Sequence, residues 1–483
     1  MPSSRRTKIV ASLGPASDDP VVLRGMLDAG VDVVRLNLSH GPVQDSLDRL
    51  ARVRAVAAQV PRPVGILADL PGPKVRTASF PVEGAVLQAG SEVAIVDAVE
   101  GVDCDEKTVA VDLPGAAGAL EPGDVLPLGD GGARLRVTAV EGDRARAVVD
   151  SGGVLRGRPG ISLPVGRADL RSPTEADLAA IEQLVAAGVD AVAVSFVQSA
   201  DDMAVVRRAV GHDGPMIVAK IETAAAVDQL DAIVRASDGV MVARGDLGVR
   251  LPLEDVPHIQ KHIIRTTVRH GKPVITATQM LESMVSNPVP TRAEVTDVAN
   301  AVFDGTSAVM LSGETAIGHD PVAVIEAMAR ITRRAEREFD YRGWGRRLGE
   351  QEVAGLADAP TTARITAAIT AAAWRASVDL DLAAVVACTR SGTTARMISR
   401  FRPTCPILAM TPSPRTARQL AMAWGIRPLV MDEHGTTDDI VWYAVETAVA
   451  DGAVRPGDLV AVLVGSPTDV DPTTDVLRLV RVR

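Results

Sequence analysis

Charged side chains follow two short apolar runs near the middle of the chain. Lys220 and Glu222 end the first run, and Arg244 and Asp246 follow the second. Apolar runs of this length, separated by an amphipathic segment of helical length, predict two parallel strands joined by a helix. Because strand side chains alternate between faces, we expect Lys220 and Glu222 to share a face, and Arg244 and Asp246 likewise. The pattern predicts cations and carboxylates together at the carboxyl ends of neighbouring strands.

These residue types suit the transfer of a phosphoryl group, which depends on positioning and charge neutralisation more than on covalent chemistry. Glu222 and Asp246 are hard oxygen ligands of the kind that Mg²⁺ uses, and salt bridges are the alternative role for them. Lys220 could stabilise negative charge that develops during transfer, although a structural ion pair would also explain it. Arg35 carries the forked donors that fit a phosphate.

The elements that must position these side chains recur along the first two thirds of the chain. Helical patterns separate eight apolar runs at residues 8–14, 31–40, 64–70, 191–196, 215–222, 239–246, 273–280 and 307–314. Eight such units are typical of an α/β fold of the (β/α)8 TIM barrel type, and an open doubly wound sheet is the alternative. The barrel is favoured because nearly every run ends in polar side chains, which a barrel brings to one mouth.

The remaining segments predict a lid, a connection and a second domain. Residues 75–168 are rich in Gly, Val and Asp with short alternating runs, which predicts a small inserted β-barrel lid domain of antiparallel strands. The catalytic barrel is then residues 1–74 and 169–340. Residues 341–360 are interpreted as a connecting segment, and residues 361–483 as a C-terminal α/β domain with a parallel sheet.

Within that last domain, Ser391, Gly392, Thr393 and Thr394 follow a predicted strand and begin a helix. Hydroxyls and backbone amides gathered at a helix N-terminus predict a phosphate-binding nest, which makes these four residues the candidates for an effector site. An ordinary capped turn explains the same residues equally well.

Composition narrows the class of protein. The 483-residue chain is 47% hydrophobic and carries a formal net charge of -10, which argues against nucleic acid as the main partner. No apolar run approaches the roughly 18 residues of a membrane span. Cys104, Cys388 and Cys405 are odd in number and widely separated, which supports neither a disulfide framework nor a zinc site and favours the cytoplasm.

Six strand-end motifs resemble those of the pyruvate kinase family. They read RLNLSHG from Arg35, AKIE from Ala219, MVARGDLG from Met241, ATQMLES from Ala277, PTRAE from Pro290 and MLSGET from Met310. They occur in the family's order, and the resemblance covers essentially the whole chain. It implies an enzyme that transfers a phosphoryl group from phosphoenolpyruvate to ADP, giving pyruvate and ATP in the last step of glycolysis. It also implies a homotetramer, and Mg²⁺ or Mn²⁺ as the cofactor.

The resemblance places the substrate at the barrel mouth. Lys220 and Arg35 would face the transferred phosphoryl group, with Arg244 also on the substrate side. The backbone amides of Gly245 and Asp246 would face the substrate carboxylate, since Gly lets a backbone approach a ligand closely.

Two further sets of candidates complete the predicted site. Thr278 is expected to take part in protonating the enolate, and Ser312 and Glu314 are candidates for a proton relay, because a hydroxyl is too weak an acid to act alone. The candidates on the nucleotide side are Arg76, His40 and Arg158, although His40 could equally be structural.

One departure from the commonest family pattern concerns a potassium site. The residues that match the family's K⁺ ligands are Asn37, Ser39, Asp69 and Leu70, but Lys74 stands where those members have Glu. A fixed ammonium near the site would repel a second cation. We therefore expect activity without added K⁺.

A second departure lies in the lid. The family usually has Lys directly before Gly160, where this chain has Pro159, which has no side-chain donor. Arg158 is expected to take over that contact. The segment Asp130-Gly131-Gly132 either helps to shape the nucleotide side or forms a hairpin turn.

Two other classes of protein share some of these features. A Mg²⁺-dependent lyase or aldolase on a barrel would use similar carboxylates, but it explains neither the lid nor the grouped basic residues. A catalytically silent, metabolite-sensing paralogue would be expected to lack Lys220 or a metal carboxylate, and all of these are present.

Overall fold

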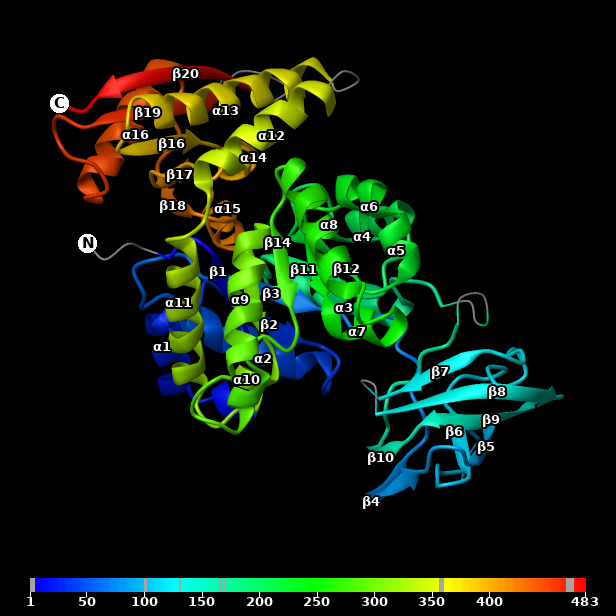
Figure 1. The fold of residues 1–483 in the computed structure, drawn as a ribbon. Helices are drawn as coiled ribbons and strands as arrows, with labels where there is room; N and C mark the ends of the chain where they lie inside the picture. Colours follow the sequence, from blue (N-terminus) through cyan, green and yellow to red (C-terminus); the bar gives the residue numbers. More distant parts are fainter. Residues whose placement is uncertain are drawn as a thin grey trace.

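The chain folds into a central barrel with a β-rich lid at one end and an α/β domain at the other (Figure 1). The structure is a computed structural model that describes residues 5–99, 102–129, 132–164, 167, 170–355, 360–465 and 473–483. The predicted fold class, a TIM barrel with an inserted β lid and a C-terminal α/β domain, is confirmed.

Eight parallel strands close the barrel in the order β1-β15-β14-β13-β12-β11-β3-β2. Their bounds are β1 Lys8–Ser12, β2 Val33–Asn37, β3 Gly65–Asp69, β11 Ala191–Val194, β12 Met216–Ile221, β13 Gly239–Ala243, β14 Val274–Ala277 and β15 Ala308–Leu311. Each strand lies inside one of the eight predicted apolar runs. The open doubly wound sheet is therefore excluded.

Helices surround this barrel and cover its outward side chains (Figure 1). They are α1 Pro20–Ala29, α2 Val43–Ala57, α3 Glu175–Ala186, α4 Ala200–Val210, α5 Ala224–Asp228, α6 Leu230–Ala236, α7 Arg244–Arg250, α8 Val256–Arg269, α9 Arg292–Asp304, α10 Gly313–Ala316 and α11 Pro321–Glu336, with short 3₁₀ turns η1 Pro15–Ser17 and η2 Glu282–Val285. On β12, Ile217 and Ala219 pack outward against this layer, whereas Met216 and Val218 belong to the barrel interior.

The lid follows β3 and has its own core. Its strands are β4 Phe80–Leu87, β5 Glu92–Asp97, β6 Thr108–Val111, β7 Val125–Leu128, β8 Ala133–Glu141, β9 Arg144–Ser151 and β10 Gly153–Gly157. They form a five-stranded sheet in the order β6-β5-β9-β8-β7 and a separate β10-β4 pair. The expectation of purely antiparallel strands is wrong, because β5 and β6 pair in parallel.

The C-terminal domain is built on a five-stranded sheet in the order β18-β17-β16-β19-β20. The strands are β16 Ala384–Cys388, β17 Ile407–Thr411, β18 Ile426–Val430, β19 Leu459–Gly465 and β20 Thr474–Arg481; the helices are α12 Tyr341–Gly355, α13 Thr361–Asp379, α14 Thr393–Ser399, α15 Pro414–Gln419 and α16 Thr437–Ala450, with a 3₁₀ turn η3 Leu420–Met422. The sheet is not entirely parallel as predicted, because β20 is an antiparallel edge strand. The expected connection at residues 341–360 carries α12.

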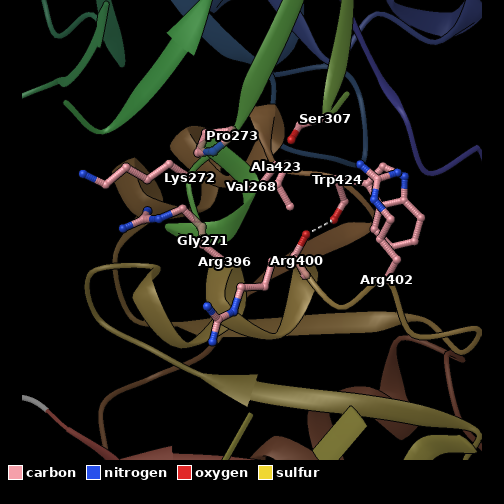
Figure 2. Close-up of a pocket in the computed structure, with 11 residues that line it drawn as sticks. Val268, Gly271, Lys272, Pro273, Ser307, Arg396, Arg400, Arg402, Ala423 and Trp424 are labelled. Atoms are coloured by element: carbon pink, nitrogen blue, oxygen red, sulfur yellow. Dashed lines mark hydrogen bonds between the residues drawn. The ribbon is translucent and has the colours of Figure 1, made fainter. Parts of the chain in front are cut away.

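The C-terminal domain closes the barrel end opposite the mouth. Ala421 and Met422 of η3 pack into the apolar interior of the barrel, and Lys8 Nζ donates to the Ile426 carbonyl at 2.8 Å. Figure 2 shows the pocket at this junction, with Lys272 on the barrel side and Trp424 on the side of the C-terminal domain. Among the described residues, no helix is both long and apolar enough to cross a membrane.

Candidate active site at the barrel mouth

The inward-facing rows of the barrel strands change from apolar to polar at the mouth. On β12, Met216 and Val218 face the interior, so strand alternation also brings Lys220 inward, one step nearer the mouth. The same change on neighbouring strands produces a set of polar side chains that we call the mouth cluster: Arg35, Asp69, Ser195, Lys220 and Glu222.

Lys220 is the centre of the mouth cluster. Its Nζ lies 3.1 Å from Asp69 Oδ1 and 2.9 Å from Glu222 Oε1, and it donates to Ser195 Oγ at 2.7 Å. Burial alone would lower the pKa of Lys220, but the charges of the two carboxylates outweigh it and raise the pKa above its usual range. Lys220 therefore stays positively charged at neutral pH.

Asp69 holds a second cation of the cluster. Arg35 Nε donates to Asp69 Oδ2 at 2.7 Å, and Arg35 Nη1 donates to Ser12 Oγ at 2.8 Å. Burial would raise the pKa of Asp69, but Lys220 and Arg35 lower it below its usual range. Asp69 is therefore ionised and fixes both cations at the mouth.

Glu222 has an oxygen suited to a divalent cation. The side chain is fully buried, and the Phe196 N–H donates to Oε2 at 2.7 Å, while Oε1 faces Lys220 Nζ at 2.9 Å. Burial raises the pKa of Glu222, and the charge of Asp246 raises it further against the opposing effect of Lys220. Two neighbouring carboxylates that repel each other are the kind of oxygen donor set that fits Mg²⁺.

The carboxylates at the mouth would form only part of a metal shell. Within the described ranges, no group of three or more His, Cys, Asp and Glu side chains is arranged to hold a metal ion. An ion held by Glu222 and Asp246 would therefore complete its coordination with substrate oxygens and water, as Mg²⁺ commonly does.

Arg244 departs from the sequence prediction. Helix α7 begins at Arg244, directly after β13, so Arg244 and Asp246 are not alternate residues of a strand and do not share a face. Arg244 Nη1 lies 2.6 Å from Asp297 Oδ1. Its Nε and Nη2 donate to the carbonyl oxygens of Ala277 and Thr278 at 3.0 and 2.7 Å. The predicted shared face is wrong, and Arg244 holds the loop that carries Thr278.

Thr278 lies against the loop between β13 and α7. The Gly245 N–H donates to Thr278 Oγ1 at 2.8 Å, so these two candidate residues are in contact. A Cβ added at Gly245 would lie 3.6 to 3.7 Å from Thr278, an ordinary contact, so the protein itself does not require glycine there. Thr278 and Gln279 have φ values of 68° and 54°, and such strain in residues other than glycine concentrates at functional sites.

Ser312 directly follows β15, and Glu314 lies in α10, where it is fully buried. The carboxylate of Glu314 accepts hydrogen bonds from Leu281 N at 3.0 Å and Ser312 N at 2.6 Å. Within the described ranges, neither side chain has a hydrogen bond to Thr278. Glu314 therefore ties the loop after β14 to the loop after β15, and a relay through it stays a prediction.

Comparison with known protein families matches both large domains. The family description "Pyruvate kinase, barrel domain" matches residues 4–325, and "Pyruvate kinase, alpha/beta domain" matches residues 367–480. The chain belongs to the pyruvate kinase family. The chain is 42% identical to the pyruvate kinase of Methylorubrum extorquens over 479 residues, which cover 99% of this chain and 98% of the relative.

Other members of the pyruvate kinase family match over the same length. The chain is 38% identical to the pyruvate kinase of Clostridium acetobutylicum over 478 residues, covering 98% of this chain and 99% of that protein. It is 39% identical to the pyruvate kinase of Geobacillus stearothermophilus over 480 residues, covering 98% of this chain and 80% of the relative. The resemblance drawn from the strand-end motifs is confirmed, and the chain is an enzyme of this phosphotransferase family.

The residues that match the pyruvate kinase K⁺ ligands lie together beside the mouth cluster. Asn37 and Asp69 are register partners on β2 and β3, and Asn37 Oδ1 accepts from Ser39 N at 3.2 Å. The Leu70 carbonyl accepts from Ser195 Oγ at 2.6 Å. The two Asp69 oxygens face Lys220 and Arg35, so four oxygens of the matching set already have partners from the protein itself.

The predicted nucleotide-side residues are divided between the barrel and the lid. Arg158 pairs with Asp112, and its Nε donates to the Thr77 carbonyl at 3.2 Å. Arg76 Nη1 donates to the Arg158 carbonyl at 3.2 Å. His40 is exposed, and partial burial together with the charges of Arg76, Arg35 and Lys74 lowers its pKa. Asp130 and Gly131 lie outside the described residues.

Sequence reasoning missed Arg250, Ser195 and Phe196. Ser195 and Phe196 directly follow β11, as other mouth residues follow their strands. This position at a strand end was the sequence signal that could have identified them. Arg250 ends α7, and its guanidinium carbon lies 4.9 Å from the centre of the Phe196 ring. Burial lowers the pKa of Arg250 against the opposing charges of Asp246 and Glu222. The only sequence signal for Arg250 was its spacing of four residues from Asp246.

The predicted effector residues line a cavity of about 320 Å³ in the C-terminal domain, apart from the mouth. Ser391, Thr393 and Thr394 all lie on its wall. Gly392 has a φ of 83°, and its N–H donates to Thr389 Oγ1 at 2.9 Å. Thr394 Oγ1 lies 2.6 Å from Thr474 Oγ1, so part of the hydroxyl set is used within the domain.

Proposed function

We propose that this enzyme transfers the phosphoryl group of phosphoenolpyruvate to ADP and produces pyruvate and ATP, as in the last step of glycolysis. The observation that carries the proposal is the mouth cluster. Lys220 is held charged between Asp69 and Glu222, and Asp246 is near enough to Glu222 to raise its pKa. Cations fixed beside a pair of metal-binding carboxylates supply what phosphoryl transfer requires.

In this proposal the protein positions charge before the reaction starts. Lys220 and Arg35 face the phosphoryl group and the oxygen of the forming enolate, and Asp69 prevents both cations from turning away. Glu222 and Asp246 hold Mg²⁺, which supplies additional positive charge to the phosphate oxygens when bound. Preorganised charge of this kind costs no reorganisation during the reaction, so it lowers the barrier rather than only tightening binding.

Thr278 is the proposed positioning group for the second half of the reaction. Its hydroxyl lies at the mouth, fixed by Gly245 N at 2.8 Å and donating to the Ala277 carbonyl at 2.7 Å. Protonation of the enolate would use a water that Thr278 orients, because a threonine hydroxyl is too weak an acid by itself. The Asp246 amide remains the proposed contact of the substrate carboxylate, and the Gly245 amide would join it only by releasing Thr278 Oγ1.

We further propose that K⁺ is not required. Asp69, the only carboxylate in the matching set, is paired with Arg35 at 2.7 Å and Lys220 at 3.1 Å, so its charge is already neutralised. Lys74 stands in the sequence where K⁺-dependent members have Glu, so an acid that would favour a second cation is missing.

The remaining proposals concern the setting of the enzyme. The cytoplasm is the proposed compartment, because Cys104, Cys388 and Cys405 are free and buried. A homotetramer and a phosphorylated effector in the cavity lined by Ser391 and Thr394 are proposed from the family. The proposed domain limits are those expected from the sequence.

The deciding experiment is a coupled assay of pyruvate formation from phosphoenolpyruvate with and without ADP, Mg²⁺ and K⁺. We expect formation that needs ADP and Mg²⁺ and continues in buffers free of K⁺. A strict need for K⁺ would reject the potassium proposal alone, whereas pyruvate release without ADP would favour a lyase or phosphatase and reject the kinase.

A further inference from the structure

A second cleft opens beside the mouth cluster, between the barrel and the lid. It is lined from the lid by Gly129, Gly160 and Ser162, and from the barrel by Asp246 and Arg250. Arg35 and Lys220 do not line it. The cleft therefore shares the proposed metal ligand Asp246 with the mouth but presents a different set of cations.

Two cations that form no salt bridge line this cleft. Lys74 and Arg250 both line it, and within the described ranges neither side chain has a hydrogen bond or an ion pair. The Lys74 side chain packs directly against Gly160 of the lid, since a Cβ added at Gly160 would lie 2.8 Å from Lys74 Cε. The carboxylates of Asp246 and Glu222 act on Arg250 through space without forming a salt bridge, and cations that no salt bridge holds beside a narrow space favour binding of an anion.

Arg250 is held in a fixed orientation toward this space. It lies one helical turn after Asp246 on α7, so both side chains project on the same side of the helix. Its guanidinium stacks 4.9 Å from the Phe196 ring centre, and the Phe196 N–H in turn binds Glu222. A stacked guanidinium keeps its edge donors free for a phosphate, which an Arg binds with two parallel hydrogen bonds.

The lid residue expected to serve this role does not supply a cation here. Pro159 has no side-chain donor, and the Arg158 guanidinium is engaged by Asp112 and by the Thr77 carbonyl. The phosphate-binding charge of the cleft therefore comes from the barrel side, through Arg250 and Lys74.

We propose that Arg250 is a nucleotide-binding residue that contacts the phosphate chain of the nucleoside diphosphate in the cleft between α7 and the lid. The inference deepens the proposed function and rests on it. The nucleotide is favoured over phosphoenolpyruvate because Arg35 and Lys220 already provide cations deeper in the mouth, whereas Arg250 lies on the side that the lid covers.

Calorimetric titration of ADP into Arg250→Gln, Arg250→Lys and wild-type enzyme tests the proposal, with phosphoenolpyruvate titrated separately. We expect Arg250→Gln to weaken ADP binding by about tenfold or more, the loss of one charge-assisted hydrogen bond, and to leave phosphoenolpyruvate binding unchanged. Arg250→Lys keeps the positive charge but not the paired guanidinium donors, so its loss of ADP affinity should be intermediate. Arg235→Gln on α6, an exposed arginine paired with Asp231, is the matched control.

The outcomes separate this inference from the proposed reaction. ADP affinity within twofold of wild type in Arg250→Gln, or an equal loss of phosphoenolpyruvate affinity, overturns the assignment. Failure of the wild type to bind ADP also overturns it. If wild type binds ADP through Arg250 but forms no pyruvate, the nucleotide contact stands and the proposed kinase reaction fails.

Discussion

At the scale of single residues, the mouth depends on charges that balance one another. Lys220 contacts two carboxylates, and one of them, Asp69, also holds Arg35 at 2.7 Å. Because these groups are buried, their mutual attraction is stronger than at a surface, and removing one changes the protonation of the others. Replacing one of these residues should therefore lower activity more than stability only if the charges that remain keep partners.

Lys220→Ala tests this distinction. We expect turnover to fall about 10²- to 10³-fold or more, since a preorganised charge facing the reacting group is lost. The stability loss should remain below the roughly 3–5 kcal/mol of a broken buried pair, because Asp69 keeps Arg35 as a partner. Turnover in a coupled assay and urea denaturation measure the two effects.

The control for that variant is Lys261→Ala. Lys261 pairs with Asp304 between α8 and α9, away from the mouth, so its loss should affect stability and leave turnover near that of wild type. Near-normal turnover in Lys220→Ala would remove Lys220 from the mechanism.

At the scale of elements, loops at the end of the barrel opposite the mouth are held by a lysine. Lys272 lies just before β14, and its Nζ donates to the carbonyls of Val234 and Arg235 at 2.7 and 2.8 Å and also to that of Ser237. These carbonyls belong to the last turn of α6 and the loop beyond it, where a cation is favourable. Burial nevertheless lowers the pKa of Lys272 to about 8. The charges of Arg396, Arg207 and Arg235 contribute to this lowering, against the opposing charge of Asp238.

This shift predicts a pH-dependent stability. Between pH 8 and the unfolded value of 10.5, the unfolded chain binds the Lys272 proton and the folded chain does not, so stability rises with pH in that window. Lys272→Met should lose this gain. Urea denaturation at pH 7.5 and 9.5 measures the difference between wild type and variant, and Lys107→Met in the lid is the control. The prediction is contradicted if the free energy of unfolding of Lys272→Met changes between the two pH values by as much as that of wild type.

At the scale of the whole molecule, aromatic residues concentrate where the barrel meets the C-terminal domain. The chain has only 4 Trp, 2 Tyr and 5 Phe, yet six of these 11 residues gather in ring contacts at this junction: Phe339, Tyr341, Trp344, Trp374, Phe401 and Trp424. Arg402, 2% exposed, lies among them, with its guanidinium carbon 4.6 Å from the Trp424 ring centre and 5.2 Å from that of Trp344.

Arg402 also connects the two domains through the backbone. Its Nη2 donates to the carbonyls of Gly305 and Thr306, which precede β15, while its own segment follows α14. Burial lowers the pKa of Arg402 to about 9, and Nε has no hydrogen-bond partner among the described residues. The cost of burying this charge is offset by the carbonyls and the aromatic rings around it.

Arg402→Ala is therefore expected to destabilise the junction by about 3–5 kcal/mol, because it leaves a cavity and unpaired carbonyls. Trp344, Trp374 and Trp424 make tryptophan fluorescence a reporter of this junction, and urea denaturation followed by that signal measures the shift. Arg427→Ala, which removes a half-exposed pair with Asp451 inside the C-terminal domain, should cost less than about 1 kcal/mol. Equal effects of the two variants would contradict the role of Arg402.

The sequence by itself determined the eight strands, the lid insertion and the polar strand ends, including Lys220, Glu222 and Asp246. Apolar runs and side-chain alternation are local properties, so they can be read without coordinates. Only the tertiary structure decided the rest. Helix α7 begins at Arg244, and that side chain pairs with Asp297. Arg158 pairs with Asp112, and Arg250 lines the cleft below the lid. These outcomes could not be predicted, because each depends on a contact between segments distant in the chain.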